Sequence, residues 1–183
     1  SFISEADEIR RAAGGDRGAQ SALVRRHMPV IYRVAFRLLR DPAEAEDVTQ
    51  ETFLRAWKIL PAWEPRAKFS TWACGVALNL CRDRLRRKKW VLLDVVPEQT
   101  DSSPQPDQHM ESADAVRRLM DHVAALPPRQ REALTLCAFE QMGNKEAAAI
   151  MSVSVHALEG LLGRARRTLR RGLEKETGHE GQA

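Results

Sequence analysis

The segment 90–110 constrains the fold more than any other feature of this sequence. It contains three prolines, two adjacent serines and four acidic residues, it lacks Lys and Arg, and it shows no helical periodicity. This composition is typical of an exposed linker, and the segment is too long for an ordinary loop inside a compact domain. We therefore expect two folded units, residues 1–89 and 111–175, joined by a flexible acidic linker and followed by a tail at 176–183.

We expect both units to be built of helices. Aromatic residues make up only 5% of the chain, whereas a β-sandwich would need more of them and more Val and Thr. In the first unit, apolar residues such as Leu23, Met28 and Ile31 recur near helical spacing. Asp41 followed by Pro42 has the pattern of an N-cap and a first helical residue. The predicted fold class is therefore all-α.

The second unit contains the spacing of a helix-turn-helix. A short helix is predicted over 145–151, after the N-cap Asn144, and a three-residue turn at 152–154 leads into a longer basic helix. Apolar residues on the two helices are spaced to pack against each other. A plain helical hairpin would show the same apolar pattern, but it has no need for a stripe of arginines on one side. We therefore favour the helix-turn-helix.

Three helix boundaries follow from local signals. Pro29 lies inside a helix predicted over 16–39 and is expected to kink or restart it. The last helix of the first unit is expected to end at Lys89, where the composition changes. The long helix of the second unit is expected to end near Arg171.

Positive charge is concentrated in two runs, although the net charge of the chain is only +4. Residues 82–89 and residues 164–175 each contain six basic residues and one acidic residue. Such runs are often no more than solvated helix faces. Because each run ends a predicted helix and is followed by a change in composition, the two runs favour binding to nucleic acid.

Other classes of protein are disfavoured by what the sequence lacks. No apolar run of about 18 residues could span a membrane, and no secretion signal is visible. Without a phosphate-binding glycine loop, a catalytic triad or a paired-carboxylate cleft, we expect no enzyme, no catalytic residues and no cofactor. The histidines show no metal-binding spacing. Cys74, Cys81 and Cys137 form no CxxC pair, which fits a reducing cytoplasm, and the first two are expected in the core.

Several segments together resemble the group 4, or extracytoplasmic-function (ECF), bacterial sigma factors. Residues 41–57, DPAEAEDVTQETFLRAW, resemble the segment by which these proteins bind core RNA polymerase. Residues 69–87, FSTWACGVALNLCRDRLRR, resemble the family's promoter −10 segment. Residues 126–136 and 163–171 resemble its −35 domain. The segments follow the family order, with a linker where the family has one.

The resemblance implies a sigma2-like helical bundle in the first unit and a sigma4-like helix-turn-helix domain in the second. It implies an alternative sigma factor that directs promoter recognition and melting. The implied partners are the β′ clamp helices and β flap of core RNA polymerase, promoter DNA that is duplex at −35 and melted at −10, and an anti-sigma factor. Together with the cysteine usage and the lack of a long apolar run, this leads us to expect a cytoplasmic protein without membrane insertion. The acidic linker either enters the path meant for RNA or serves as a bare spacer.

Core polymerase is expected to contact one face of the helix that begins after Asp41. Residues on this face recur with the i, i+3, i+4 and i+7 spacing of neighbours on a helix surface. They are Asp47, Gln50, Glu51 and Leu54. An ordinary solvated face has the same spacing, and the match to the family segment favours polymerase binding.

The melted −10 element is expected to contact the loop 62–69 and the helix after it. Asn79 offers both a donor and an acceptor to an exposed base edge, and nearby basic residues can attract the DNA backbone. The expected contacts are Lys68, Asn79, Arg82, Asp83, Arg86 and Lys89. For Trp72 core packing is favoured over base stacking, and for Trp63 both remain open.

The −35 duplex is expected to contact the second helix of the helix-turn-helix, whose N-terminal half reads base edges in the major groove. Glu159 can accept from a cytosine amino group, glycines allow close approach of the backbone, and arginines contact phosphates. The expected contacts are His156, Glu159, Gly160, Gly163, Arg164, Arg167 and Arg171. Family members often carry Gly-Thr-Val-Lys-Ser-Arg where this chain has HALEGL at 156–161, which affects the promoter sequence expected rather than the class of function.

Two other functions are weighed against this one. A sigma-mimic adaptor that sequesters an anti-sigma factor usually carries a receiver domain and tends to lose the basic residues that this chain keeps. A stand-alone helix-turn-helix regulator would need a dimerisation element, and none is visible in the sequence.

Overall fold

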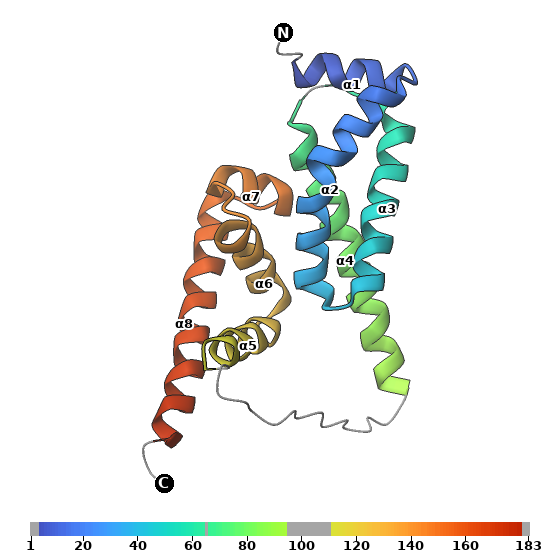
Figure 1. Ribbon diagram of the computed structural model, residues 1–183. Helices are drawn as coiled ribbons and strands as arrows, with labels where there is room; N and C mark the ends of the chain where they lie inside the picture. The colour runs from blue at the N-terminus through green and yellow to red at the C-terminus, as the bar shows by residue number, and fades with distance from the viewer. Residues whose placement is uncertain (1–3, 65, 95–110, 181–183) are drawn as a thin grey trace.

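The computed structural model describes residues 4–64, 66–94 and 111–180, and every regular element in these ranges is a helix. Figure 1 shows two groups of helices side by side, α1 to α4 in blue to green and α5 to α8 in yellow to red. The prediction of an all-α fold with two helical units is confirmed. Residues 95–110 of the expected linker and the last three residues of the expected tail lie outside the described residues.

The first unit contains four α-helices and one short 3-10 turn. They are α1 (Glu5–Ala13), α2 (Arg17–Leu39), α3 (Pro42–Ile59), η1 (Leu60–Ala62) and α4 (Phe69–Asp94). Each of the first three α-helices begins with a side-chain cap, in which Ser4, Asp16 or Asp41 accepts a hydrogen bond from a backbone N–H three residues later. The predicted start of α3 at Asp41 and Pro42 is therefore confirmed.

The helix α2 packs against α1, α3 and α4 and supplies much of the core. Leu23 and Ile31 are fully enclosed on either side of Pro29. Enclosing one such side chain contributes about 2 kcal/mol, so packing on both sides holds the helix together across the hydrogen bond that the proline removes. Accordingly, α2 continues through Pro29 without restarting.

The second unit holds the helix-turn-helix. Its elements are α5 (Glu111–Ala124), α6 (Pro128–Leu134), the π-helical turn η2 (Thr135–Phe139), α7 (Asn144–Met151) and α8 (Val155–Glu180). Ser152 turns the chain with a left-handed φ of 55°, and the Ser154 hydroxyl accepts a hydrogen bond from the N–H of Ala157 at 3.0 Å. Leu158 and Leu162 of α8 are buried, as the predicted packing requires.

Two helices are longer than their sequences indicate. α4 continues past Lys89 to Asp94, so residues 90–94, expected in the linker, are helical. α8 continues past Arg171 to Glu180. Its extension packs on α5, where Glu176 lies 3.0 Å from His122. No glycine or proline follows Lys89 before Pro97, so no local signal ends α4 there. α8 continues through Gly172, which follows Arg171 and lies against His122 of α5.

The two units touch each other along an interunit contact, made chiefly by α4 with α7 and by α2 with η2. One continuous cluster of buried apolar side chains draws on both units. Among the described residues, four ion pairs cross the contact: Arg33 with Glu140 at 2.8 Å, Arg37 with Glu140 at 3.8 Å, Arg40 with Asp121 at 3.0 Å, and Arg82 with Glu132 at 2.7 Å. The Glu132 and Glu140 side chains are only 4% and 3% exposed, so each buried charge depends on its arginine.

Candidate nucleic-acid and polymerase interfaces

The residues expected to bind core polymerase lie on one face of α3. Asp47, Gln50 and Leu54 are exposed and Glu51 is half-buried, while the opposite side of the helix packs into the first unit. Leu54 is 61% exposed, which leaves a large apolar side chain in water. Glu51 pairs with Arg55 at 2.6 Å along the helix. This face therefore combines polar groups with one apolar contact.

A shallow groove of about 410 Å³ borders this face between α2 and α3. Thr49 and Gln50 line it from α3, and Met28, Pro29 and Tyr32 line it from α2. Met28, one of the apolar residues at helical spacing, is 45% exposed rather than part of the core. Sequence reasoning missed this contribution of α2, because the apolar residues of a long helix at the centre of a unit cover more than one face.

Three residues assigned to the −10 element follow one another along one side of α4. Asn79, Asp83 and Arg86 are separated by four and three residues, which aligns them on a helix. Asn79 is exposed, and its Oδ1 accepts a hydrogen bond from Arg82 at 3.1 Å. The Arg86 side chain is 66% exposed and lies 3.4 Å from Asp83. Lys89 is also exposed, so this end of the helix is strongly basic.

Arg82 has a different environment from the other residues assigned to the −10 element. Its guanidinium donates two hydrogen bonds to the Glu132 carboxylate of α6, at 2.9 and 2.7 Å. These bonds raise the pKa of Arg82, and Glu132 is almost fully buried. Arg82 can therefore reach DNA only after the interunit contact opens at this point.

The connection between η1 and α4 forms part of a pocket of about 240 Å³. Trp63 and Trp72 both line it, edge to face, with ring centroids 5.4 Å apart. Both are half-buried, so each packs in the unit and also borders the pocket. The buried Nε1 of Trp63 has no hydrogen-bond partner among the described residues. Lys68 is exposed just before α4.

The residues assigned to the −35 element lie along α8. His156, Glu159, Arg164, Arg167 and Arg171 are exposed, and Gly160 and Gly163 are half-buried. The Arg164 side chain lies next to Gly160. A Cβ added at Gly160 would be 3.4 Å from the Nη1 of Arg164. A Cβ at Gly163 would meet nothing within 4 Å. Glu159 accepts a hydrogen bond from Asn144 at 3.5 Å, which links the starts of α7 and α8.

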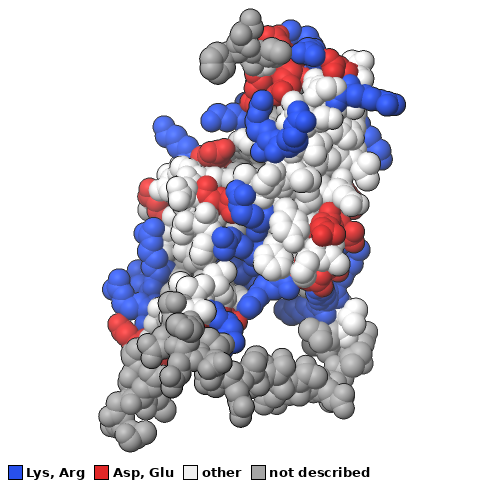
Figure 2. Space-filling view, viewed as in Figure 1, with Lys and Arg blue, Asp and Glu red and all other residues white. Residues whose placement is uncertain are grey.

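The three predicted sets form separate surfaces on α3, α4 and α8 rather than one cleft. Figure 2 shows Lys and Arg along the edge formed by α8, at the boundary between the units, and where α4 leaves the bundle. Extended basic surfaces of this kind suit a polyanion.

Cysteine and metal chemistry contribute little to these surfaces. Cys74 and Cys81 are buried in the core, as expected, and burial raises the pKa of each thiol to about 12. Within the described ranges no three potential ligands gather into a metal site. No helix in the described part of the chain is long and apolar enough to cross a membrane.

Two family models match this chain, one in each unit. Residues 23–91 match the family described as Sigma-70 region 2, and residues 117–169 match the family described as Sigma-70, region 4. The first match contains α3 and most of α4, and the second contains the helix-turn-helix.

Relatives match over nearly the whole chain. The ECF RNA polymerase sigma factor SigE of Mycolicibacterium smegmatis is 31% identical, over 93% of this chain and 69% of its own length. The RNA polymerase sigma factor CnrH of Cupriavidus metallidurans is 32% identical, over 90% of this chain and 93% of its own.

Solved structures show the same fold. CnrH in complex with the cytosolic domain of CnrY matches with a TM-score of 0.71 and 28% identity, over 93% of this chain and 97% of CnrH. The sigma factor RpoE from Bartonella quintana, solved with the anti-sigma factor NepR, matches with a TM-score of 0.67 over 84% of this chain and 96% of its own. The second match, at 21% identity, is a likeness of fold alone.

Proposed function

We propose that this chain, which belongs to the sigma-70 family of RNA polymerase sigma factors and to its ECF group, divides promoter recognition between its two units. As an alternative sigma factor it binds core RNA polymerase and directs transcription initiation. The first unit holds the polymerase and the melted −10 element, and the second binds the −35 duplex. The observation that carries this assignment is that α3, α4 and α8 each present an exposed surface with the required chemistry.

The α3 face binds the β′ clamp helices. Asp47 and Gln50 supply polar contacts, and Leu54, now 61% exposed, is buried when the partner helix covers it. Burying such a side chain contributes about 1 to 2 kcal/mol to association. The groove beside Gln50 receives a side chain of the partner between α2 and α3. The second unit contacts the β flap.

The −10 element is held open by α4 and the connection before it. An extruded base enters the pocket between Trp63 and Trp72, where aromatic faces replace its lost stacking. Asn79 donates to and accepts from an exposed base edge. Lys68, Arg86 and Lys89 attract the phosphates, and Arg82 joins them once it leaves Glu132.

The −35 duplex receives the first turns of α8 in its major groove. Glu159 accepts from a cytosine amino group, and the backbone at Gly163 comes close to the DNA because no side chain intervenes. Arg164, Arg167 and Arg171 contact phosphates, which orients the helix without reading sequence.

RNA synthesis itself is catalysed by the polymerase, and this chain contributes recognition only, in the cytoplasm.

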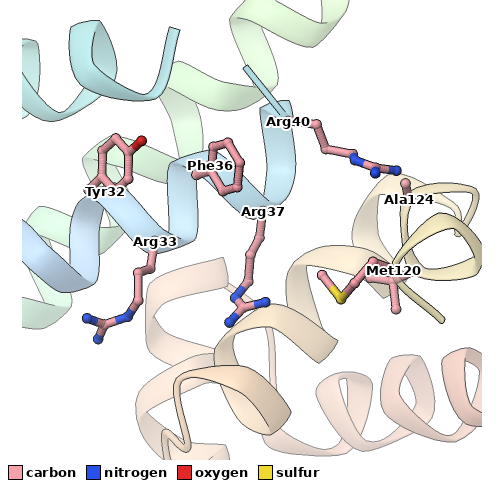
Figure 3. Close-up of a pocket in the computed structure, with 8 residues that line it drawn as sticks. Tyr32, Arg33, Phe36, Arg37, Arg40, Met120 and Ala124 are labelled. Atoms are coloured by element: carbon pink, nitrogen blue, oxygen red, sulfur yellow. The ribbon is translucent and has the colours of Figure 1, made fainter. Parts of the chain in front are cut away.

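An anti-sigma factor that touches both units is also part of the proposal. A groove of about 380 Å³ spans the units, with Phe36 and Arg37 of α2 and the following Arg40 on one side and Met120 and Ala124 of α5 on the other (Figure 3). Apolar side chains between arginines suit an amphipathic segment that carries acidic residues. RpoE of Bartonella quintana, which shares the fold, was solved in complex with the anti-sigma factor NepR.

The assignment of α4 is tested by Asn79→Ala in reconstituted holoenzyme. Because Asn79 is exposed, the variant should fold normally, form closed complexes with near-normal affinity, and open promoters poorly. Gel shifts measure the first step, and permanganate reactivity of unpaired thymines measures the second. Arg164→Ala serves as a matched control that should weaken the closed complex instead. Normal melting by Asn79→Ala would contradict the role given to α4.

A further inference from the structure

The end of α4 carries an aromatic side chain outside the sites described so far. Trp90 belongs by composition to the linker, yet it lies on α4, which continues to Asp94. Figure 1 shows this end of α4 projecting past the turn between α2 and α3. We infer that Trp90 is a further nucleic-acid contact, which stacks on an unpaired base of single-stranded DNA. The inference rests on the proposed function of α4 in holding melted DNA.

The geometry of α4 aligns Trp90 with the residues assigned to the −10 element. Positions 79, 83, 86 and 90 are separated by four, three and four residues, so they form one stripe along the helix. At 1.5 Å per residue, Trp90 lies about 16 Å from Asn79 along the axis. A strand that places a base at Asn79 and continues along the basic stripe therefore passes the indole.

The exposure of Trp90 indicates that this side chain does little to stabilise the fold of the free protein. It is 67% exposed, the largest value among the bulky apolar side chains of the described residues. The other three tryptophans are half-buried and pack against aromatic rings: Trp57 against Phe53, Trp63 against Trp72, and Trp72 against Phe69. An indole held in water on an ordered helix can gain contacts only by meeting a partner.

The charges around Trp90 indicate that this partner is an anion. Arg86, Arg87, Lys88 and Lys89 precede it within one helical turn and are all exposed. Among the described side chains three acidic groups face this region: Asp83 lies 3.4 Å from Arg86, Asp41 lies 3.7 Å from Lys88, and Glu44 pairs with Arg84 and lines a pocket with Arg87 and Lys88. The cations outnumber these acids. An aromatic face within a basic stripe matches the way proteins bind single strands, because every base has a face to stack. Paired bases in a duplex offer no such face.

The test measures binding of the full chain, alone and in holoenzyme, to a fluorescently labelled oligo(dT) strand and to a labelled duplex of equal length. Trp90→Ala should weaken binding to the single strand about 5-fold or more, which corresponds to the loss of one stacked base. Trp90→Phe should restore most of this binding. Val91→Ala is the matched control, since Val91 is equally exposed at 63% but lies off the stripe. Val91→Ala should change single-strand affinity less than 2-fold. On the duplex, Trp90→Ala, Trp90→Phe and Val91→Ala should each change affinity less than 2-fold.

Salt dependence separates stacking from charge. Trp90→Ala should keep the slope of affinity against salt, because no cation is removed, whereas Arg86→Ala should lower it. If Arg86→Ala weakens single-strand binding and Trp90→Ala does not, the inference about Trp90 is wrong and the proposed role of α4 stands. Equal losses on single strand and duplex would also overturn it. If the wild-type protein and its holoenzyme both fail to bind the single strand, both the inference about Trp90 and the proposed role of α4 are wrong.

Discussion

Two glycines of α8 have different surroundings, which indicate a role in packing for one and a role in binding for the other. A Cβ at Gly172 would lie 2.7 Å from the Nδ1 of His122, so Gly172 permits α5 to approach α8. Gly163 has no such neighbour, and a Cβ there would meet nothing within 4 Å. A glycine inside a helix costs about 0.5 to 1 kcal/mol relative to alanine. Gly163 therefore weakens the free protein without a packing reason.

Gly163→Ala is expected to raise the free energy of unfolding by about 0.5 to 1 kcal/mol and to weaken binding to a −35 duplex. The stabilisation follows from helix propensity, and the loss of binding follows from a methyl group between the backbone and DNA. Chemical denaturation and DNA titration measure the two effects. Gly172→Ala, in the same helix, should instead destabilise the protein. Unchanged DNA affinity of the Gly163 variant would show that DNA does not approach this position.

The exposure of single site residues follows from helix periodicity in most cases but not at Arg82. Once α3 and α4 are placed on the sequence, their apolar positions determine which side faces water, and Asp47, Asn79 and Arg86 fall on that side. The partner of Arg82 is Glu132, 50 residues away along the chain. No local pattern relates these two residues, because their contact exists only when the units pack together.

Among the elements, the starts of most helices are easier to predict than their ends, although Asn144 is the first residue of α7 and Gly143 takes the N-cap position expected for it. Asp41 and Ser154 are caps whose side chains bond to backbone N–H groups three residues later, and both can be read from the sequence. α4 continues past its charged run to Asp94, and α8 continues through Gly172 to Glu180, where its contact with α5 extends it. The π-helical turn η2 likewise depends on packing, with Thr135 and Leu136 buried.

Substitutions on the exposed face of α3 test whether this helix binds core polymerase. Asp47→Ala combined with Gln50→Ala should weaken binding to core polymerase about 5- to 140-fold, equivalent to the loss of two polar contacts of about 0.5 to 1.5 kcal/mol each. Both side chains are exposed, so the melting temperature should not change. The double variant Asp7→Ala with Arg10→Ala removes an exposed pair from α1 and serves as the control. Native polymerase binding by the folded α3 variant would rule out this face.

At the scale of the whole molecule, the interunit contact holds the chain in a closed arrangement. Arg82 is bound by Glu132, and Arg33 of α2 and Arg40, which follows α2, pair with acidic residues of the second unit. Arg37 adds a cation–π contact, with its guanidinium carbon 4.2 Å from the centre of the Phe139 ring. The residues proposed to bind melted DNA and those that hold the two units together therefore overlap at Arg82.

Arg33→Ala is expected to open this arrangement. Without Arg33, the buried Glu140 carboxylate keeps only Arg37, at 3.8 Å, which costs roughly 1 to 3 kcal/mol. The radius of gyration from small-angle X-ray scattering should rise while the helix content stays constant. Single-stranded DNA affinity should rise as well, because Arg82 is released with the contact. Arg10→Ala, which breaks an exposed pair within α1, is the control, and an unchanged radius in Arg33→Ala would contradict a closing role for the pair.

Run-off transcription tests most directly whether the three surfaces act together to start transcription. Purified core RNA polymerase is supplied with a pool of promoter fragments from the source organism, with and without this chain. We expect discrete transcripts only when the chain is present, and their loss with the Asp47→Ala, Gln50→Ala double variant. If the chain binds core polymerase tightly and yet produces no promoter-specific transcript from the pool, it does not work as an initiating sigma factor.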